Sequence, residues 1–320
     1  MTADDPATAM PGARAGTVVV FGPSPLLEVS VETDPRGRER VRLLPGGQAV
    51  WVSRMAATMG SAVTLCGMSG GRTGSLLQSM LEHEQFATRL VPTHASTGCF
   101  VVDQRQEPPR DLAADWALPP SAAEIETLVA TTIHEAQGAD VVVVCNPMPG
   151  DALPLNVYAR VVAALAARTV PVVVDLSTPR LDAALRGGPA MVKLNDWELA
   201  ELVVSPVDEV GERRAAMLRL VDMGARSVIV TRGSSSVFAL DHSGAGVELH
   251  PPRLGAGQAA GCGDAMTGAL AAALAQGVPW RQGVVRGMAA GAAYYVGRDE
   301  ASRSAVDEMA RHITWRHVPP

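Results

Sequence analysis

Short apolar runs alternate along this chain with stretches in which apolar residues recur every three or four positions. The short runs are rich in valine and isoleucine, which is typical of buried strands, and the longer stretches have the period of amphipathic helices. Strands that alternate with helices are joined by crossovers and form a mostly parallel sheet, so the sequence predicts an α/β fold. The clearest strands are expected at 17–21, 140–145, 170–175, 190–194 and 227–231, and the clearest helices at 48–60, 73–85, 121–137, 155–168, 210–223, 265–276 and 280–296.

Two regions outside this rhythm have the pattern of half-exposed strands. Residues 24–45 alternate apolar and polar side chains on both sides of a charged turn, and residues 88–115 contain further edge-like strands. We expect these regions to supply a small β-sheet lid on one domain that spans 17–320. The proline-rich and acidic segment 107–120 is expected to be a loop, and 308–320 a terminal helix with a short end.

Composition and charge exclude several classes of protein. The formal net charge is -6 and no basic block occurs, so nothing favours nucleic-acid binding. No apolar run approaches the roughly 20 residues that span a bilayer, and residues 1–16 have no apolar segment of the kind a signal peptide needs. The cysteines are scattered without metal-binding spacing, as in a protein with reduced thiols. We therefore expect a cytoplasmic protein with a disordered tail at 1–16 and no membrane contact.

The candidate chemistry is concentrated at Gly261-Cys262-Gly263-Asp264, which precedes an alanine-rich helix. Unpaired amides and the helix dipole attract anions to the start of a helix, and glycine lets the backbone come close to a ligand. Two interpretations of Asp264 remain open. Either it takes a proton from a hydroxyl nucleophile while the neighbouring amides hold the phosphoryl group being transferred, or it is an ordinary helix cap.

Two other motifs lie at the ends of predicted helices or strands. The glycine pair Gly46-Gly47 precedes a predicted helix, and Asn195 with Glu198 follows a predicted strand that contains Lys193, the only lysine of the chain. Asn195 and Glu198 are also placed to cap the next helix. In parallel sheets the ligand crevice lies beyond the carboxyl ends of the strands. The residues expected at such ends include Asp175, Asn195 and Thr231.

Taken in order, the three motifs resemble the PfkB carbohydrate kinases, a ribokinase-like family, over about 280 residues of this chain. The branch that looks most similar contains 1-phosphofructokinase and tagatose-6-phosphate kinase. The resemblance implies a three-layer α/β/α fold with a mostly parallel central sheet and a small β-sheet lid. It also implies a carbohydrate kinase that uses ATP and Mg²⁺ to phosphorylate a hydroxyl of a sugar or sugar phosphate, and a homodimer formed through the lid.

The resemblance also implies a role for each matching residue. Asp264 is the expected base, and the loop Gly261-Cys262-Gly263-Asp264 is the expected anion hole, through the amides of Cys262, Gly263 and Asp264, with cysteine where alanine is usual. Asn195 and Glu198 are expected to influence Mg²⁺ through water, which suits an ion that keeps much of its hydration. The expected nucleotide-binding residues are Lys193, Asn195, Thr231 and Gly233, and the expected substrate-binding residues are Glu28, Gly46, Gly47 and Trp51.

The expected acceptor site departs from the family pattern. Gln48 and Trp51 replace a lysine and a sugar-contacting asparagine, and Thr97 stands in place of an arginine. Losing two charged hydrogen bonds of about 1.5–3 kcal/mol each weakens phosphate binding considerably. The alternative function is therefore a catalytically weak or inactive regulatory protein that binds a nucleotide or ligand. A Rossmann-type dinucleotide enzyme is not favoured, because residues 21–25 contain no Gly-x-Gly-x-x-Gly turn.

Overall fold

A computed structural model describes residues 15–34, 36–106, 109–116, 119–147, 153–297 and 301–318. Most of its strands are β1 (Thr17–Phe21), β4 (Ala62–Ser69), β5 (Ala87–Pro92), β8 (Val141–Cys145), β9 (Val172–Asp175), β10 (Met191–Asn195), β11 (Ser227–Thr231), β12 (Val237–Asp241), β13 (Gly246–His250) and β14 (Thr314–Val318). They form one ten-stranded sheet in the order β14-β13-β12-β11-β10-β9-β8-β1-β4-β5. Pairing is parallel from β11 to β5 and antiparallel from β11 to β14.

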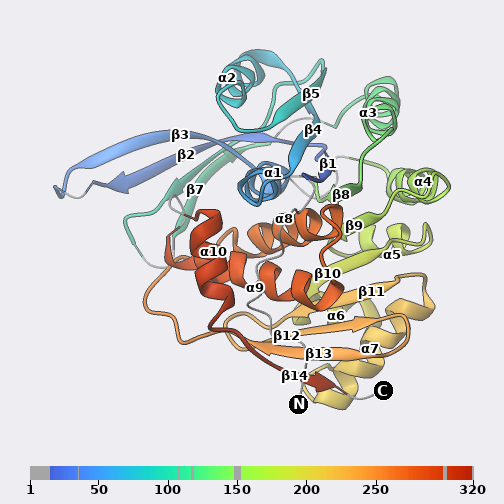
Figure 1. Ribbon diagram of the computed structural model, residues 1–320. Coiled ribbons are helices and arrows are strands. Elements are labelled where there is room, and N and C mark those ends of the chain that lie inside the picture. The colour runs from blue at the N-terminus through green and yellow to red at the C-terminus, as the bar shows by residue number, and fades with distance from the viewer. Residues whose placement is uncertain are drawn as a thin grey trace.

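Helices cover both faces of this sheet (Figure 1). One face carries α1 (Gln48–Thr58), α8 (Cys262–Ala275), α9 (Trp280–Val296) and α10 (Arg303–Ala310), and α2 (Gly71–Leu81) packs at its edge. The other carries α3 (Ala122–Glu135), α4 (Leu155–Ala166), α5 (Arg180–Leu185), α6 (Asp196–Val203) and α7 (Val210–Asp222). Side chains of β1 alternate between the two cores: Val18 and Val20 enter the first, Val19 and Phe21 the second. The predicted three-layer α/β/α fold with a mostly parallel sheet is thus confirmed. No helix in the described part of the chain is long and apolar enough to cross a membrane.

A second sheet of four strands, here called the lid, lies beside the main sheet (Figure 1). Its order is β3-β2-β6-β7, with β2 at Leu26–Thr33, β3 at Glu39–Gly46, β6 at Cys99–Asp103 and β7 at Arg110–Asp115. Sheet strands usually turn apolar side chains inward and polar ones toward solvent, but parts of β2 and β3 do the reverse. Glu28 and Ser30 are buried, whereas Val41 and Leu43, which pair with the intervening positions of β2, are 64% and 45% exposed. At these positions β2 therefore turns polar side chains inward and β3 turns apolar side chains outward.

Three expectations about strands were wrong. Residues 110–115 form β7 inside the predicted loop, because β6 offers an edge with which even a polar segment can pair. Residues 87–92 belong to the central sheet, where β5 pairs with β4, so this part of the predicted lid region is not in the lid. Residues 314–318 form β14 on β13 instead of an irregular end. Residues 1–14 of the predicted tail, and 107–108 and 117–118 of the predicted loop, lie outside the described residues.

The contact between α1 and α8 brings the beginnings of both helices together. A Cβ atom on Gly268 would lie 2.4 Å from the carbonyl oxygen of Val52, so only glycine permits this approach. Further along both helices, Gln276 Nε2 donates to the carbonyl oxygen of Met59 at 2.9 Å, which shows that they run in the same direction. One turn before Gly268 stands Asp264, and one turn before Val52 stands Gln48. The first turns of α1 and α8 are therefore level with each other.

Candidate active site

A buried charged cluster lies beneath the first turn of α8. Lys193 Nζ on β10 is 3.2 Å from Asp175 Oδ2 at the end of β9. Thr267 Oγ1 on α8 is 2.5 Å from the same carboxylate oxygen and 3.0 Å from the carbonyl oxygen of Gly263. All three side chains are buried. This cluster ties the carboxyl ends of two neighbouring strands to the start of the helix that carries Asp264.

Lys193 lies directly against the glycine loop. A Cβ atom on Gly263 would be 2.8 Å from Lys193 Nζ, so a larger residue there would displace the ammonium group. Burial acts to lower the pKa of Lys193, but the negative charges of Asp175, Asp264 and Glu198 outweigh it, and the pKa of the ammonium is raised above its usual value. The single lysine is therefore held in its charged form among carboxylates.

The loop before α8 has the backbone that its glycines predict. Gly261 is the N-cap of α8 and has φ 87°, in the left-handed region. A Cβ atom there would also lie 2.8 Å from Tyr294 Cε1 on α9, so both conformation and space require glycine. Asp264 is half-buried in the first turn of the helix. The negative charges of Asp175 and Asp264 both act on the nearby Cys145 thiol, whose pKa is raised well above its usual value, chiefly by burial.

The amides of this loop are not equivalent. The backbone N–H of Cys262 donates to the carbonyl oxygen of Ala259 at 3.2 Å, so one of the three expected anion-binding amides already has an acceptor. The amides of Gly263 and Asp264 belong to the first helical turn, where the geometry of a helix provides no acceptor on its own backbone. The helix dipole adds partial positive charge at the same place. The Gly261–Asp264 loop therefore stays the candidate anion site, directly above Lys193.

Asn195 and Glu198 form a capping box at the start of α6. Asn195 Oδ1 accepts from the amide of Glu198, and Glu198 Oε2 accepts from the amide of Asn195, both at 2.8 Å. Burial raises the pKa of Glu198 above its usual value. In the described part of the chain, no group of three or more His, Cys, Asp or Glu side chains is arranged to hold a metal ion. The capping bonds of Asn195 and Glu198 fix both side chains at the start of α6, and their water-mediated role toward Mg²⁺ stays a prediction.

The loop after β11 lies next to this capping box. Thr231 pairs in register with Asn195, and its Oγ1 is 3.5 Å from the carbonyl oxygen of Leu194. Gly233 follows in a tight turn with φ 53°. Arg232 Nε is 3.6 Å from Asp196 Oδ2, so this arginine is part of an ion pair between the two loops. The four expected nucleotide-binding residues are thus on adjacent strand ends.

Gln48 has a positioning role that the sequence did not suggest. Its Oε1 accepts from the amide of Asn146 at 2.7 Å, and its Nε2 donates to the carbonyl oxygen of Asp175 at 3.3 Å. Asn146 Oδ1 in turn accepts from the amide of Ser177 at 3.1 Å. The side chain of Gln48 therefore links the start of α1 to the loops that follow β8 and β9.

The base of the lid brings three expected substrate-binding residues together. A Cβ atom on Gly46 would be 3.4 Å from Glu28 Oε2, so the carboxylate lies close to the Gly46 backbone. Gln104 Nε2 donates to Glu28 Oε1 at 3.3 Å, and the carboxylate is buried. Gly47, with φ 90°, is the N-cap of α1. Gly46, Gly47 and Glu28 thus border the same end of α1.

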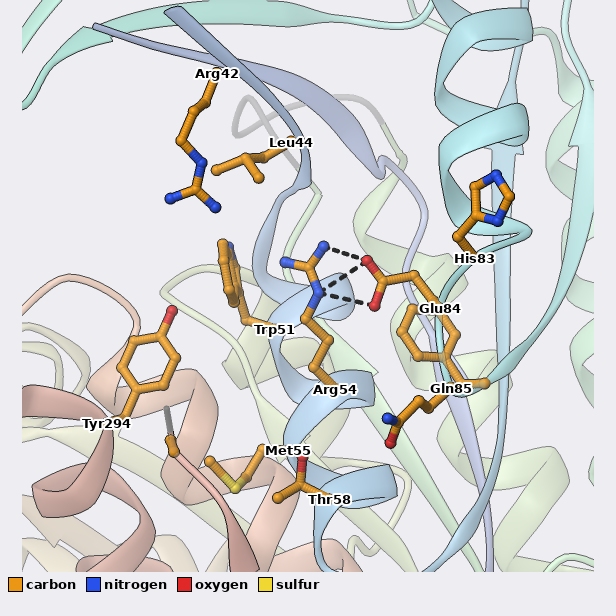
Figure 2. A pocket seen from close by; sticks show the side chains of 12 residues that line it. Arg42, Leu44, Trp51, Arg54, Met55, Thr58, His83, Glu84, Gln85 and Tyr294 are labelled. Atoms are coloured by element: carbon orange, nitrogen blue, oxygen red, sulfur yellow. Dashed lines mark hydrogen bonds and ion pairs between the residues drawn. The ribbon is translucent and has the colours of Figure 1, made fainter. Parts of the chain in front are cut away.

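Trp51 and Thr97 occupy different surroundings. The rings of Trp51 and Tyr294 make an edge contact with centroids 5.8 Å apart, and the Arg54 guanidinium lies 4.3 Å from the indole centroid. Trp51 lines a cavity of about 380 Å³ that Glu28, Gly46 and Asp264 do not line (Figure 2). Thr97 Oγ1 accepts from the amide of Gly70 at 3.0 Å and closes a loop. Of these two departures from the family pattern, Trp51 lines a cavity and Thr97 stabilises the backbone.

The sequence did not single out three members of this site as functional. Asp175 was placed only by its position at a strand end. Thr267 lies in a run of small residues at the start of a predicted helix, and no motif contains Tyr294. No periodicity or motif marks a hydroxyl that reaches across to a carboxylate 92 residues earlier in the chain. Only the packing of α8 on the sheet brings them together.

A carboxylate and a glycine loop stand at a helix start above the carboxyl edge of a three-layer α/β/α sheet and beside a lid, which is the arrangement expected of a ribokinase-like kinase. A model of the pfkB family carbohydrate kinases matches residues 24–303. The chain belongs to this family, as its motifs predicted.

The relatives are kinases of sugar phosphates by name. The chain is 28% identical over 254 residues to "ATP-dependent 6-phosphofructokinase isozyme 2" of Escherichia coli (strain K12), covering 78% of this chain and 81% of that protein. It is 23% identical over 269 residues to "1-phosphofructokinase" of Bacillus subtilis (strain 168), covering 83% and 87%. The solved structure of phosphofructokinase-2 from Escherichia coli with fructose-6-phosphate has a TM-score of 0.82 at 24% identity, and covers 93% of this chain and 99% of that chain. At that identity the structural likeness shows the fold alone.

The Lys193–Asp175 pair can be tested by a double-mutant cycle on the free energy of unfolding. Lys193→Met leaves buried carboxylates uncompensated, so we expect a loss of about 3–5 kcal/mol, and Asp175→Asn is also expected to destabilise. The double variant should lose clearly less than the sum, because the two residues share one interaction. Urea unfolding measures all four proteins.

The exposed pair of Arg186 and Asp182, 3.0 Å apart with side chains 74% and 41% exposed, is the matched control. Its cycle should give a coupling below about 1 kcal/mol. If the losses of unfolding free energy for Lys193→Met and Asp175→Asn were additive, the two side chains would not interact in the way proposed.

Proposed function

We propose that this protein is an ATP-dependent kinase that transfers the γ-phosphoryl group to a hydroxyl of a sugar or sugar phosphate. The observation that carries the proposal is the first turn of α8. There the carboxylate of Asp264 and the amides of the glycine loop stand above the buried ammonium of Lys193. Membership of the pfkB family supports the same reaction.

In the proposed mechanism, Asp264 accepts the proton of the acceptor hydroxyl as the phosphoryl group arrives. The amides of Gly263 and Asp264 donate hydrogen bonds to the transferred group, and the amide of Cys262 joins them if its 3.2 Å bond to Ala259 opens. Lys193 adds a positive charge directly beneath the loop. In such transfers positioning and charge stabilisation supply most of the rate acceleration.

The residues present fit a nucleotide. The close backbone around Gly261 and Gly263 leaves no room for a Cβ atom, as a phosphate cradle requires. We propose that Lys193, Asn195, Thr231 and Gly233 hold ATP along the ends of β10 and β11. Bound Mg²⁺ would neutralise charge on the phosphates, and Asn195 with Glu198 would orient the water around it.

The proposed acceptor is a sugar phosphate, as for a 1-phosphofructokinase-like enzyme. Support comes from the names of the relatives, which are phosphofructokinases. Glu28, Gly46 and Gly47 would contact the sugar at the base of the lid. Gln48 and Thr97 both bond the backbone, so the phosphate must be bound by cations other than those usual in the family.

Asp264→Asn tests the reaction. An amide cannot take the hydroxyl proton, so we expect ATP consumption to fall by about 10²–10⁴-fold while ATP binding by calorimetry is retained. The assay is a screen of ATP consumption across sugars, sugar phosphates and nucleosides. Asp182→Asn, on the surface of α5, is the control and should retain full activity. Turnover that survives Asp264→Asn would refute the proposed base, and ATP binding without turnover on any acceptor would favour the regulatory alternative.

We also propose that the protein forms a homodimer through the lid, and that it works in the cytoplasm, where its four cysteines stay free. The support is the apolar outer face of the lid, with Val41 64% and Leu43 45% exposed next to the half-buried Val29 and Val31. Exposed apolar patches of this kind mark contact surfaces. A solved phosphofructokinase-2 from Escherichia coli is titled a tetrameric form, so a relative does associate.

Val41→Glu tests the lid dimer. A charge on the outer face would be buried without a partner in the dimer, so sedimentation at micromolar protein should shift from dimer to monomer. Leu155→Glu places the same charge on an exposed apolar position of α4, 43% exposed, and should leave the assembly unchanged. A wild-type protein that sediments as a monomer would rule out the proposed dimer.

A further inference from the structure

The last turns of α9 lie directly against the glycine loop that starts α8. Gly291, Tyr294 and Tyr295 follow one another by three or four residues, so they share one face of α9. A Cβ atom on Gly291 would lie 3.1 Å from the carbonyl oxygen of Cys262, which is closer than side-chain carbons normally come to backbone. This face of α9 therefore packs on the backbone of the loop.

The stretch 257–261, which leads into the loop, is held by α9 at both of its ends. The amide of Gln258 donates to the carbonyl oxygen of Tyr295 at 3.0 Å. At the other end, a Cβ atom on Gly261 would lie 2.8 Å from Tyr294 Cε1 and 3.0 Å from the hydroxyl oxygen of the same ring. The side chain of Tyr294 thus lies on the residue with which α8 begins, three positions before Asp264.

Tyr294 is itself in contact with α1. Its ring is 5% exposed and meets the indole of Trp51 edge-on, at an interplanar angle of 73° (Figure 2). The guanidinium of Arg54 covers the indole at 4.3 Å, and Glu84 accepts from Arg54 Nε at 3.0 and 3.1 Å. Because Trp51 is packed on one side by Arg54 and on the other by Tyr294, the tyrosine ring is held in one position.

The contact with Trp51 also connects Tyr294 to the base of the lid. The amide of Trp51 donates to the carbonyl oxygen of Gly47 at 3.4 Å, so the indole stands one turn along α1 from its N-cap. Gly47 is one of the residues proposed to contact the acceptor. Tyr294 therefore touches the proposed phosphoryl-binding loop on one side and the helix that begins at the proposed acceptor site on the other.

We propose that Tyr294 is a positioning residue for the phosphoryl transfer. Its ring fixes Gly261, and thereby the loop amides and Asp264, relative to the start of α1. This role rests on the proposed kinase function, in which the loop and Asp264 act on a hydroxyl bound near Gly47. Tyr294 acts through Gly261, and a displacement of about 1 Å in such a site can lower the rate by about 10²-fold.

The first test is amide hydrogen exchange in the full chain, measured by mass spectrometry on peptides from 257–266. The amides of this stretch that donate to a backbone carbonyl oxygen include those of Gln258, Cys262 and Ala265. Tyr294→Leu removes the ring that lies on the loop, so this stretch should exchange at least about tenfold faster. Tyr294→Phe keeps the ring and should exchange far more slowly than Tyr294→Leu.

Tyr158→Leu is the matched control. Tyr158 is also buried, at 0% exposed, and makes an edge contact with Phe21, but it lies in the core on the other face of the sheet. Its replacement should lower the thermal unfolding temperature and leave exchange at 257–266 unchanged. A loss of stability is thereby separated from a loss of loop position.

Trp51→Leu is a second route to the same contact, and it keeps Tyr294 in place. We expect faster exchange at 257–266, by a smaller factor than in Tyr294→Leu. Added to Tyr294→Leu, the same change should have almost no further effect, because Trp51 acts on the loop through the tyrosine ring. This variant also decides the matter if Tyr294→Leu does not fold.

Steady-state kinetics test the effect on the reaction. Tyr294→Leu should lower kcat and kcat/KM for ATP by the same factor, about 10 to 10², because ATP still binds while the reacting groups are misaligned. Tyr294→Phe should recover most of this loss. Tyr158→Leu should keep both constants at a temperature well below its unfolding transition.

Three results would overturn the proposal: unchanged exchange at 257–266 in Tyr294→Leu, faster exchange there with unchanged kcat, and a Tyr294→Phe variant as defective as Tyr294→Leu. The exchange measurement needs no turnover. If the wild-type protein phosphorylates no acceptor, the proposed kinase reaction fails, and exchange still shows whether the ring of Tyr294 holds the loop. The two failures are therefore distinguishable.

Discussion

The pairing of Lys193 with Asp175 beneath the first turn of α8 is the interaction on which the proposed chemistry depends. A buried ammonium next to one carboxylate is costly to desolvate, and only good geometry and further hydrogen bonds compensate for it. The structure provides these through Thr267, which adds its hydroxyl to the same oxygen of Asp175. The result is a fixed positive charge under Gly263, with Asp264 one residue further along the helix. An anion above the loop then meets a cation that cannot move away.

Helix α1 and the lid are positioned around this buried pair by direct contacts. Gly268 lets α1 and α8 approach so closely that their first turns are level, and Gln48 joins the start of α1 to the backbone of Asp175. The lid starts from the same place, since β3 runs directly into α1. On β2 and β3, the inward-facing Glu28 and Ser30 and the outward-facing Val41 and Leu43 are the reverse of what a strand that merely covers a core would show. This polarity suits a sheet that faces a polar ligand on one side and a partner on the other.

Much of the fold was predictable from the sequence because it follows from local patterns. The valine runs indicated the parallel strands, and the glycine pattern at Gly261 indicated a tight turn into a helix, which the structure has with Gly261 in the left-handed region. The edges of both sheets were not predictable, since β7 and β14 are polar segments that become strands only because a neighbouring edge is available. The same holds for the site. Asp264, Asn195 and Glu198 belong to motifs, whereas the contact of Thr267 with Asp175 and the cavity lined by Trp51 arise between segments far apart in the chain.

The most direct test of the central claim is a crystal structure of the protein with Mg²⁺ and a non-hydrolysable ATP analogue. The account predicts the terminal phosphate within hydrogen-bond distance of the Gly263 and Asp264 amides, with Lys193 still paired to Asp175 and the Asp264 carboxylate facing the base of the lid. A terminal phosphate bound away from this loop, or an Asp264 carboxylate turned toward bulk solvent, would contradict it.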